Sequence, residues 1–262
     1  TRYVSVQLGI GGLQPFDATV VDQTGYGDCK ALSNYTVALL REAGVKGYFT
    51  TIMGGEGEPD VDIDFPSHQA NHVIVSVPTS LDTIWLECTN QTNPFGYLGT
   101  FTGDRKGLMI TENGGKLVHT IRYGAEQNTQ IRKADVVLQL TGDATAKVKT
   151  MYSGIQYENG DLNAYLDKHP DDQRKWLQQN TFIPSFDIST FSMMNNKDKI
   201  PSGVVTAELI LKRFATVSGK RIFLTPNLMN RSTYIPEKLE SRKTSIVIKH
   251  GYIDRDTINY NL

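Results

Sequence analysis

The sequence predicts an α+β protein built from two domains. Up to about residue 100, one amphipathic run is followed by short apolar runs, which indicates a mixture of helix and strand. From about residue 116 onward, short runs rich in β-branched residues alternate with turn residues, which is typical of β-hairpins. A chain of 262 residues exceeds a typical small domain, so two domains are the default expectation.

A glycine-rich stretch marks the expected junction between the two regions. Residues 99–107 read GTFTGDRKG and contain three glycines, which favour turns and irregular backbone. We therefore place the first domain at residues 1–107 and the second at residues 108–262.

The clearest predicted element is a helix over residues 29–43. Asp28 is a residue type that caps helix N-termini, and Gly44 is the residue type that ends helices. Spacings of three and four residues place one set of side chains on a common face. That set comprises Leu32, Tyr35, Leu39 and Ala43.

Three strands are expected after this helix. Residues 45–53 predict the first strand, and a polar, glycine-rich loop over residues 54–71 follows it. Residues 72–77 (HVIVSV) and 83–89 (TIWLECT) predict a strand pair joined by a turn at residues 78–80.

The second domain is predicted to be an antiparallel, sandwich-like β domain. Its strands are expected at residues 134–140, 144–152, 204–217, 220–228 and 244–253. Residues 161–180 predict a helix that breaks or restarts at Pro170, because a proline ring blocks the preceding helical turn.

Cys29 is a candidate reactive thiol at the start of the predicted helix. Two cysteines, Cys29 and Cys88, cannot form a disulfide framework for a chain of this size, so a cysteine that matters here matters as a thiol. At the start of a helix, unpaired backbone N–H groups and the helix dipole stabilise a thiolate. The alternative is a small buried cysteine that begins a core helix.

His72 and Glu87 complete a possible catalytic set. His72 opens one strand of the predicted pair, and Glu87 lies in the other, close enough for its carboxylate to hold the imidazole. Strand alternation places Cys88 on the opposite side from Glu87, as a core residue and not a disulfide partner of Cys29. Asp82 is a weaker choice of acid, because it lies beside the turn. Thiol catalysis needs a cysteine, a base and a group that orients the base.

These motifs resemble the bacterial transglutaminase-like superfamily. GYGDCKALSNYTVALLREAGV, followed by NHVIVSV and WLECT, is similar to the family's Gly-Asp-Cys-Lys helix start, Asn-His strand start and acidic strand. The resemblance covers about residues 2–101, including the opening RYVSVQLGIGGLQPFDA. It implies a papain-like core, with Cys29 as nucleophile, His72 as general base and Glu87 as orienting acid. The family usually has Asp and Pro where this chain has Glu87 and Cys88.

Further site residues are expected around this triad. The Cys29 backbone N–H is a candidate oxyanion donor. Gln23 is a weaker candidate, by analogy with the spacing in papain-like enzymes. Candidates for the substrate cleft are Gly27, Asp28, Asn71 and Trp85.

The expected activity is cysteine-dependent acyl transfer at an amide. Water as the acceptor makes the protein a peptidase or amidase, and an amine makes it a cross-linking enzyme. The resemblance favours hydrolysis of a peptide or protein substrate. The alternative is a catalytically degenerate module that binds peptide or polysaccharide at the cell envelope, and the substitution at Glu87 keeps that alternative open.

The resemblance also implies an extracytoplasmic location. It further implies that an additional N-terminal β domain belongs to the longer protein. No apolar stretch reaches the 18 residues that a membrane-spanning helix needs, so no transmembrane segment is expected. Nucleic acid is not expected as a partner, because the net charge is −1 and the chain has no long basic run.

No metal or cofactor is expected. Asp60, Asp62 and Asp64 begin like a calcium loop, but Phe65 and Asn71 occupy positions that need glycine and glutamate. This segment is interpreted as a solvated acidic loop that could favour cationic substrates. A zinc site made by Cys29, His68 and His72 is a weaker alternative to the thiol site.

Overall fold

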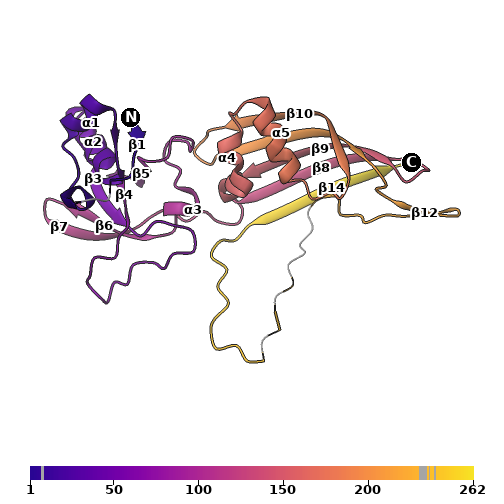
Figure 1. Cartoon of the computed structure of the whole chain (residues 1–262). Helices are drawn as coiled ribbons and strands as arrows, with labels where there is room; N and C mark the ends of the chain where they lie inside the picture. The colour runs from indigo at the N-terminus through magenta and orange to yellow at the C-terminus, as the bar shows by residue number, and fades with distance from the viewer. Residues whose placement is uncertain (7–8, 230–234, 236, 239) are drawn as a thin grey trace. The chain divides into compact units, whose positions relative to one another are not determined.

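The computed structural model describes residues 1–6, 9–229, 235, 237–238 and 240–262. It divides the chain into two compact units, Thr1–Tyr123 and Gly124–Leu262 (Figure 1). Both units combine helices with a β-sheet, so the protein is a mixed helix and strand structure of the α+β type.

The first unit is organised around a five-stranded sheet with the order β5-β4-β3-β6-β7. All neighbouring strands in this sheet are antiparallel. The strands are β3 (Tyr48–Ile52), β4 (His72–Pro78), β5 (Thr83–Leu86), β6 (Lys106–Thr111) and β7 (Gly114–His119). The expected boundary after residue 107 is therefore misplaced, because it falls inside β6, which pairs with β3.

The remaining elements of the first unit are short, except for one helix. They are β1 (Arg2–Tyr3), the 3-10 helix η1 (Gly9–Gly12), α1 (Ala18–Thr24), β2 (Tyr26–Gly27), α2 (Cys29–Glu42) and α3 (Gly99–Thr102). β1 and β2 form a small parallel pair. α3 occupies the glycine-rich stretch that the sequence indicated as a junction.

Helix α2 confirms the predicted start and stop signals. The Asp28 side chain accepts a 2.9 Å hydrogen bond from the Ala31 N–H, and the left-handed residue Gly44 (φ 74°) follows the last turn. The helix packs against β4, and the Ser33 hydroxyl donates a 3.2 Å hydrogen bond to the Val73 carbonyl.

The predicted inward face of α2 is correct only in its first half. Leu32 is buried, whereas Leu39 is 51% exposed and Ala43 is also exposed. The inward residue of the last turns is Leu40, whose Cδ1 lies 2.7 Å from the position that a Cβ on Gly47 would take. The absence of a side chain at Gly47 thus lets this end of the helix approach the sheet.

Trp85 belongs to a core cluster of the first unit and not to a cleft wall. It packs with Ile52, Ile74 and Leu98, all of them buried. A second cluster, made by Val21, Ala31 and Leu32, lies where α1 meets α2, and Cys88 packs against it. Strand alternation predicted a core position for Cys88; the structure shows it partly buried against this cluster, just beyond the end of β5.

Truncating Ile74 to alanine should destabilise the first unit by about 2–5 kcal/mol, because the side chain is fully buried and leaves a cavity. Denaturant unfolding followed by Trp85 fluorescence, in a Trp176→Phe background, measures this loss. Ile84→Ala on the neighbouring strand is the matched control, since Ile84 is 36% exposed and its truncation should cost far less. Equal losses for the two variants would contradict the cluster as the core of this unit.

The second unit contains a five-stranded sheet with the order β10-β11-β9-β8-β14. Its strands are β8 (Thr129–Leu138), β9 (Ala144–Ser153), β10 (Phe186–Asn196), β11 (Ser202–Leu211) and β14 (Ile253–Asn261). The hairpin of β8 and β9 confirms the prediction for this region. β12 (Thr216–Ser218) and β13 (Arg221–Phe223) form a separate two-stranded pair.

Helices cover one side of this sheet. They are the 3-10 helix η2 (Gly154–Asp161), α4 (Leu162–Tyr165) and α5 (Pro170–Gln179), which begins with Pro170 in its first turn, as predicted. A Cβ on Gly203 of β11 would lie 2.9 Å from Leu166 and 3.1 Å from Leu162, so the chain around α4 packs directly on the strand. The Trp176 ring of α5 meets Tyr152 of β9 edge to face, with centroids 6.5 Å apart.

The expected antiparallel sandwich is therefore corrected in two ways. Helices pack where a second sheet would lie, and β14 runs parallel to β8. The strand predicted at residues 244–253 is also misplaced, because the described part of this segment pairs only from Ile253 onward. The long connection after β13 allows the last strand to return in the same direction as β8.

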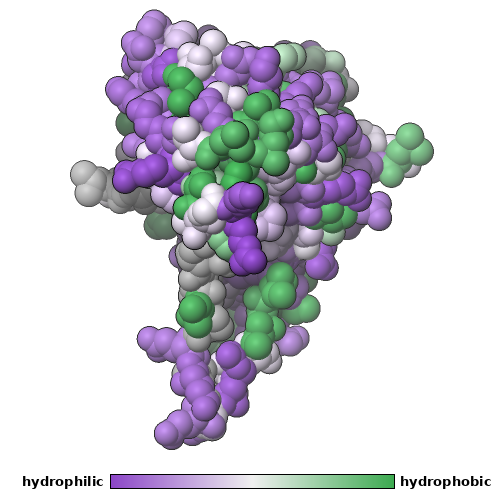
Figure 2. Space-filling model, turned by 90° about the vertical axis from the view of Figure 1, so that its right-hand side faces the viewer, coloured by the Kyte–Doolittle hydropathy of each residue, from purple (hydrophilic) through white to green (hydrophobic). Residues whose placement is uncertain are grey.

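Figure 2 shows one side of the molecule, on which hydrophilic residues dominate and hydrophobic residues gather near the centre. Large exposed hydrophobic side chains of the second unit include Val137, Leu140, Ile210 and Phe223.

Within the described ranges, the structure contains no helix with the length and apolar character that crossing a membrane requires.

Candidate active site

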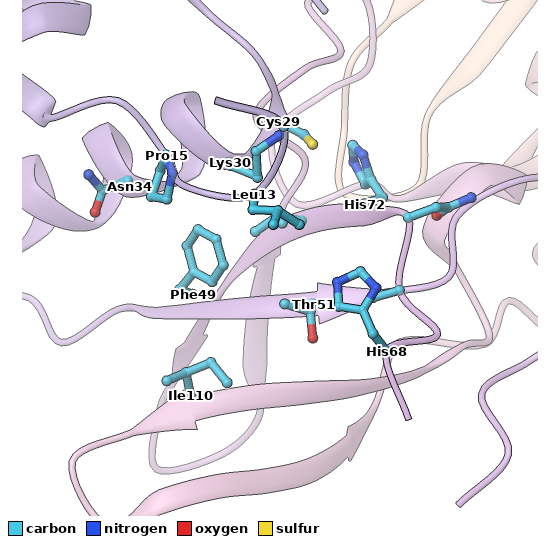
Figure 3. A pocket seen from close by; sticks show the side chains of 14 residues that line it. Leu13, Pro15, Cys29, Lys30, Asn34, Phe49, Thr51, His68, His72 and Ile110 are labelled. Atoms are coloured by element: carbon cyan, nitrogen blue, oxygen red, sulfur yellow. The ribbon is translucent and has the colours of Figure 1, made fainter. Parts of the chain in front are cut away.

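Cys29 is the first residue of α2 and is 7% exposed. The preceding Asp28 carboxylate is occupied, because it caps Ala31 and forms an ion pair with Lys30. The backbone N–H of Cys29 is one of the first four of the helix, which have no partner within the helix itself. Figure 3 shows the Cys29 sulfur and the His72 ring facing each other across a cleft.

His72 opens β4 and lies between Cys29 and a carboxylate. Its Nε2 is 3.1 Å and 3.0 Å from the two carboxylate oxygens of Glu87. Cys29 is the other group that, with Glu87, raises the pKa of His72. Because Glu87 takes Nε2, the ring nitrogen that remains for Cys29 is Nδ1. The three residues that the sequence selected as a triad are thus brought together by α2, β4 and the residue after β5.

Glu87 is held by several donors besides His72. The Thr89 N–H and hydroxyl donate to its Oε1 at 3.1 Å and 2.6 Å. The Thr102 hydroxyl donates to its Oε2 at 3.4 Å. The glutamate side chain therefore reaches the imidazole and is restrained there.

Burial and pairing oppose each other in setting the charge of His72. Burial by itself lowers the pKa of His72, but hydrogen bonds with Cys29 and Glu87 and their negative charges outweigh it and raise the pKa from 6.5 to about 9. Burial likewise raises the pKa of Glu87, but the hydrogen bond and charge of His72 and the donors of Thr89 bring that pKa below its ordinary value. The site therefore favours an imidazolium beside a carboxylate at neutral pH.

Phe101 contacts the imidazole from α3, in the glycine-rich stretch that the sequence predicted as a domain junction. Its ring meets His72 edge to face, with centroids 5.0 Å apart and an interplanar angle of 71°. A Cβ on Gly54 would lie 3.0 Å from Phe101 and 3.3 Å from the His72 Cβ, so this position favours glycine. No local pattern identifies Phe101, because only the fold brings residue 101 beside residue 72.

A cavity of about 620 Å³ exposes Cys29 and His72 on one side of the sheet (Figure 3). Its polar lining includes Lys30, Asn34, Thr51, His68 and Asn71, and its apolar lining includes Leu13, Pro15, Phe49, Val73 and Ile110. None of the described residues that line this cavity is acidic. Asn71 lines the cleft as predicted, and its side chain also holds the Gly54 N–H and carbonyl at 2.7 Å and 2.9 Å.

The other predicted cleft residues have different places. Gly27 is buried against α2, where a Cβ would lie 2.8 Å from the Ala31 Cβ. Asp28 is the helix cap, and Trp85 is in the core. Gln23 is exposed on α1 and is outside the cavity lining, so the structure does not bring it to Cys29. Asp82 lies in the turn before β5 and is exposed.

Among the residues that the structure describes, no group of three or more His, Cys, Asp or Glu side chains is arranged to hold a metal ion. Asp60 instead accepts hydrogen bonds from the Val61 and Lys106 N–H groups, both at 2.9 Å. Both cysteines are free thiols, and burial raises the pKa of Cys88.

Comparison with known proteins leaves this geometry as the basis for any functional assignment. Searches of protein-family models, curated proteins and solved structures find no significant match to this chain.

Proposed function

We propose that the first unit is a cysteine-dependent amide hydrolase with a Cys29, His72 and Glu87 triad. The observation that carries this proposal is the position of His72, which bonds Glu87 through Nε2 and presents its other nitrogen to Cys29 in an open cavity. This arrangement has the three roles of thiol catalysis: a nucleophile, a base and a residue that orients the base. The resemblance to the papain-like core of transglutaminase-like proteins agrees with it.

The proposed reaction proceeds in two steps. The Cys29 thiolate attacks the amide carbonyl, and the backbone N–H of Cys29 is available to the oxyanion that forms. The His72 imidazolium then donates its proton to the leaving amine as the carbon–nitrogen bond breaks, which leaves a thioester on Cys29. In the second step His72 removes a proton from water and the resulting hydroxide attacks the thioester. The carbon–sulfur bond then breaks, the acid leaves, and the Cys29 thiolate and the His72 imidazolium are restored.

Hydrolysis is preferred to cross-linking by the family resemblance alone. An amine that reached the thioester before water would form a new amide instead. The substrate proposed on the same grounds is a peptide or protein encountered outside the cytoplasm.

Alkylation of Cys29 by iodoacetamide at pH 6 tests the proposal without a known substrate. In a Cys88→Ala background, we expect rapid alkylation that slows strongly in His72→Ala, because the imidazolium stabilises the reactive thiolate. Glu87→Gln should slow the reaction less, since the histidine remains. Mass spectrometry of the intact protein gives the rate at each pH.

The matched control replaces His68, a second histidine that lines the same cavity. His68→Ala should leave the pH 6 rate of iodoacetamide alkylation close to that of the parent protein, since His68 only lines the cavity. A rate that rises only near the ionisation of a free thiol, and that ignores both His72→Ala and Glu87→Gln, would contradict catalysis. The protein would then be a binding module that retains the fold.

A further inference from the structure

The side of the first sheet that carries the cleft continues beyond it as an apolar surface. Strand pairing places Val73 of β4 opposite Thr51 of β3, Thr51 opposite Leu108 of β6, and Leu108 opposite Leu117 of β7. Directly opposed residues project from the same face of a sheet. A row of side chains therefore leads from Val73, which follows His72, across three further strands.

The far end of this row is open to solvent. α2 packs against β4, whereas Leu108 and Leu117 are 40% and 54% exposed. Large contiguous apolar surfaces that are exposed mark interaction sites or ligand-binding grooves. The opposite face of β6 is not exposed in this way, because its residues Gly107 and Met109 are buried.

A second cavity, of about 370 Å³, lies over this part of the sheet. Its apolar lining consists of Val61, Ile63, Pro66, Ala70, Leu108 and Leu117. Thr51, His68 and Ala70 line both this cavity and the one that exposes Cys29, so the two cavities are adjacent. We call the second cavity the apolar groove.

The loop wall of the apolar groove is held by hydrogen bonds to its own backbone. The Gln69 amide donates to the Asp62 and Phe65 carbonyls at 3.0 Å and 2.8 Å, and its oxygen accepts from the Asp62 N–H at 2.8 Å. Asp60 ties the start of the loop to the N–H of Lys106 in β6 at 2.9 Å. A groove whose walls are already ordered loses less entropy when a ligand binds.

We propose that the apolar groove binds an aliphatic or aromatic side chain of the substrate, next to the amide at Cys29. This inference rests on the proposed function, because it assigns the substrate class of the same site. Its basis is the shared lining of the two cavities, which places the apolar groove beside the cavity that exposes Cys29. The substrate is accordingly an amide that carries a large apolar side chain beside the reacting carbonyl.

Two haloacetamides of different size test this inference. Chloroacetamide can react with Cys29 but has no group that would occupy the apolar groove. N-benzylchloroacetamide adds an aromatic group that can enter the apolar groove. After division by the rate of each probe with glutathione, we expect the benzyl probe to alkylate Cys29 about tenfold faster and with saturation. Leu117→Ser and Leu108→Ser should each reduce this preference several-fold, because apolar contact is removed.

Ile84→Ser is the matched control for these variants. Ile84 is an exposed apolar residue on β5, the opposite edge strand of the same sheet, so its replacement should leave the probe preference unchanged. The ratio of the two probe rates is the quantity compared, since it cancels a general change in the reactivity of Cys29.

The outcomes separate the groove from the catalytic proposal. If alkylation depends on His72 but shows no probe preference, or a preference that both leucine variants retain, the groove inference is overturned and the triad stands. If the preference is present but alkylation ignores His72, the groove is supported and catalysis fails. A dimer in solution that Leu117→Ser dissociates would assign this surface to a second copy of the chain and overturn the inference.

Discussion

Replacing Cys29 by alanine is expected to reduce kcat/KM for peptide amide hydrolysis by about 10⁴-fold or more, because no other group can form the covalent intermediate. The same substitution should abolish the acyl adduct that an activated ester leaves on the protein. Mass spectrometry of the intact protein after mixing with p-nitrophenyl acetate measures that adduct directly, and peptide mapping places it on Cys29.

Cys88→Ala is the matched control for this experiment. Cys88 packs against the cluster of Val21, Ala31 and Leu32, and burial raises the pKa of its thiol, so it should not carry the adduct. An adduct that survives in Cys29→Ala and disappears in Cys88→Ala would contradict the assignment of the nucleophile.

The second large effect expected is a loss of stability of the first unit as the pH rises from about 6.5 to 9. The pKa of His72 is 6.5 in an unfolded chain and about 9 in the folded protein. A histidine whose pKa is raised on folding stabilises the protein fully below the unfolded value, and this stabilisation is lost as the pH passes the folded value. The shift corresponds to about 3 kcal/mol in the free energy of unfolding.

Denaturant titrations at several pH values, followed by Trp85 fluorescence in a Trp176→Phe background, measure this dependence. His72→Gln should remove the decline between the two pKa values, since glutamine has no proton to release. Glu87→Gln should weaken the decline, because the carboxylate is one of the two groups that raise the pKa of His72. An unchanged decline in His72→Gln would show that other groups cause it, and the proposed charge state of the site would be wrong.

Several features of the site could be predicted from sequence because the signals are local. Asp28 and Gly44 bound α2, and the position of Cys29 follows directly from that helix start. Short apolar runs with a turn between them predicted β4 and β5, and the proximity of His72 and Glu87 follows from their pairing. In these cases the interacting residues are near in sequence or belong to adjacent strands.

Other features depend on contacts between distant segments. Phe101 of α3 meets His72 of β4 only in the folded chain, because the two residues are far apart in sequence. The boundary between the units lies after β7, because β6 pairs with β3 of the first sheet. The helices over the second sheet and the parallel return of β14 likewise depend on tertiary packing, which alternation along a strand does not encode.

The sequence by itself determined that Cys29 begins a helix and that His72 and Glu87 lie close together on a strand pair, because helix caps, strand alternation and turn residues act over a few positions. Tertiary structure alone decided the cleft lining, the position of Trp85 in the core, and the row of side chains from Val73 to Leu117. The physical reason is that burial and cavity shape arise from side chains contributed by several strands and loops at once. No single segment of the chain contains that information.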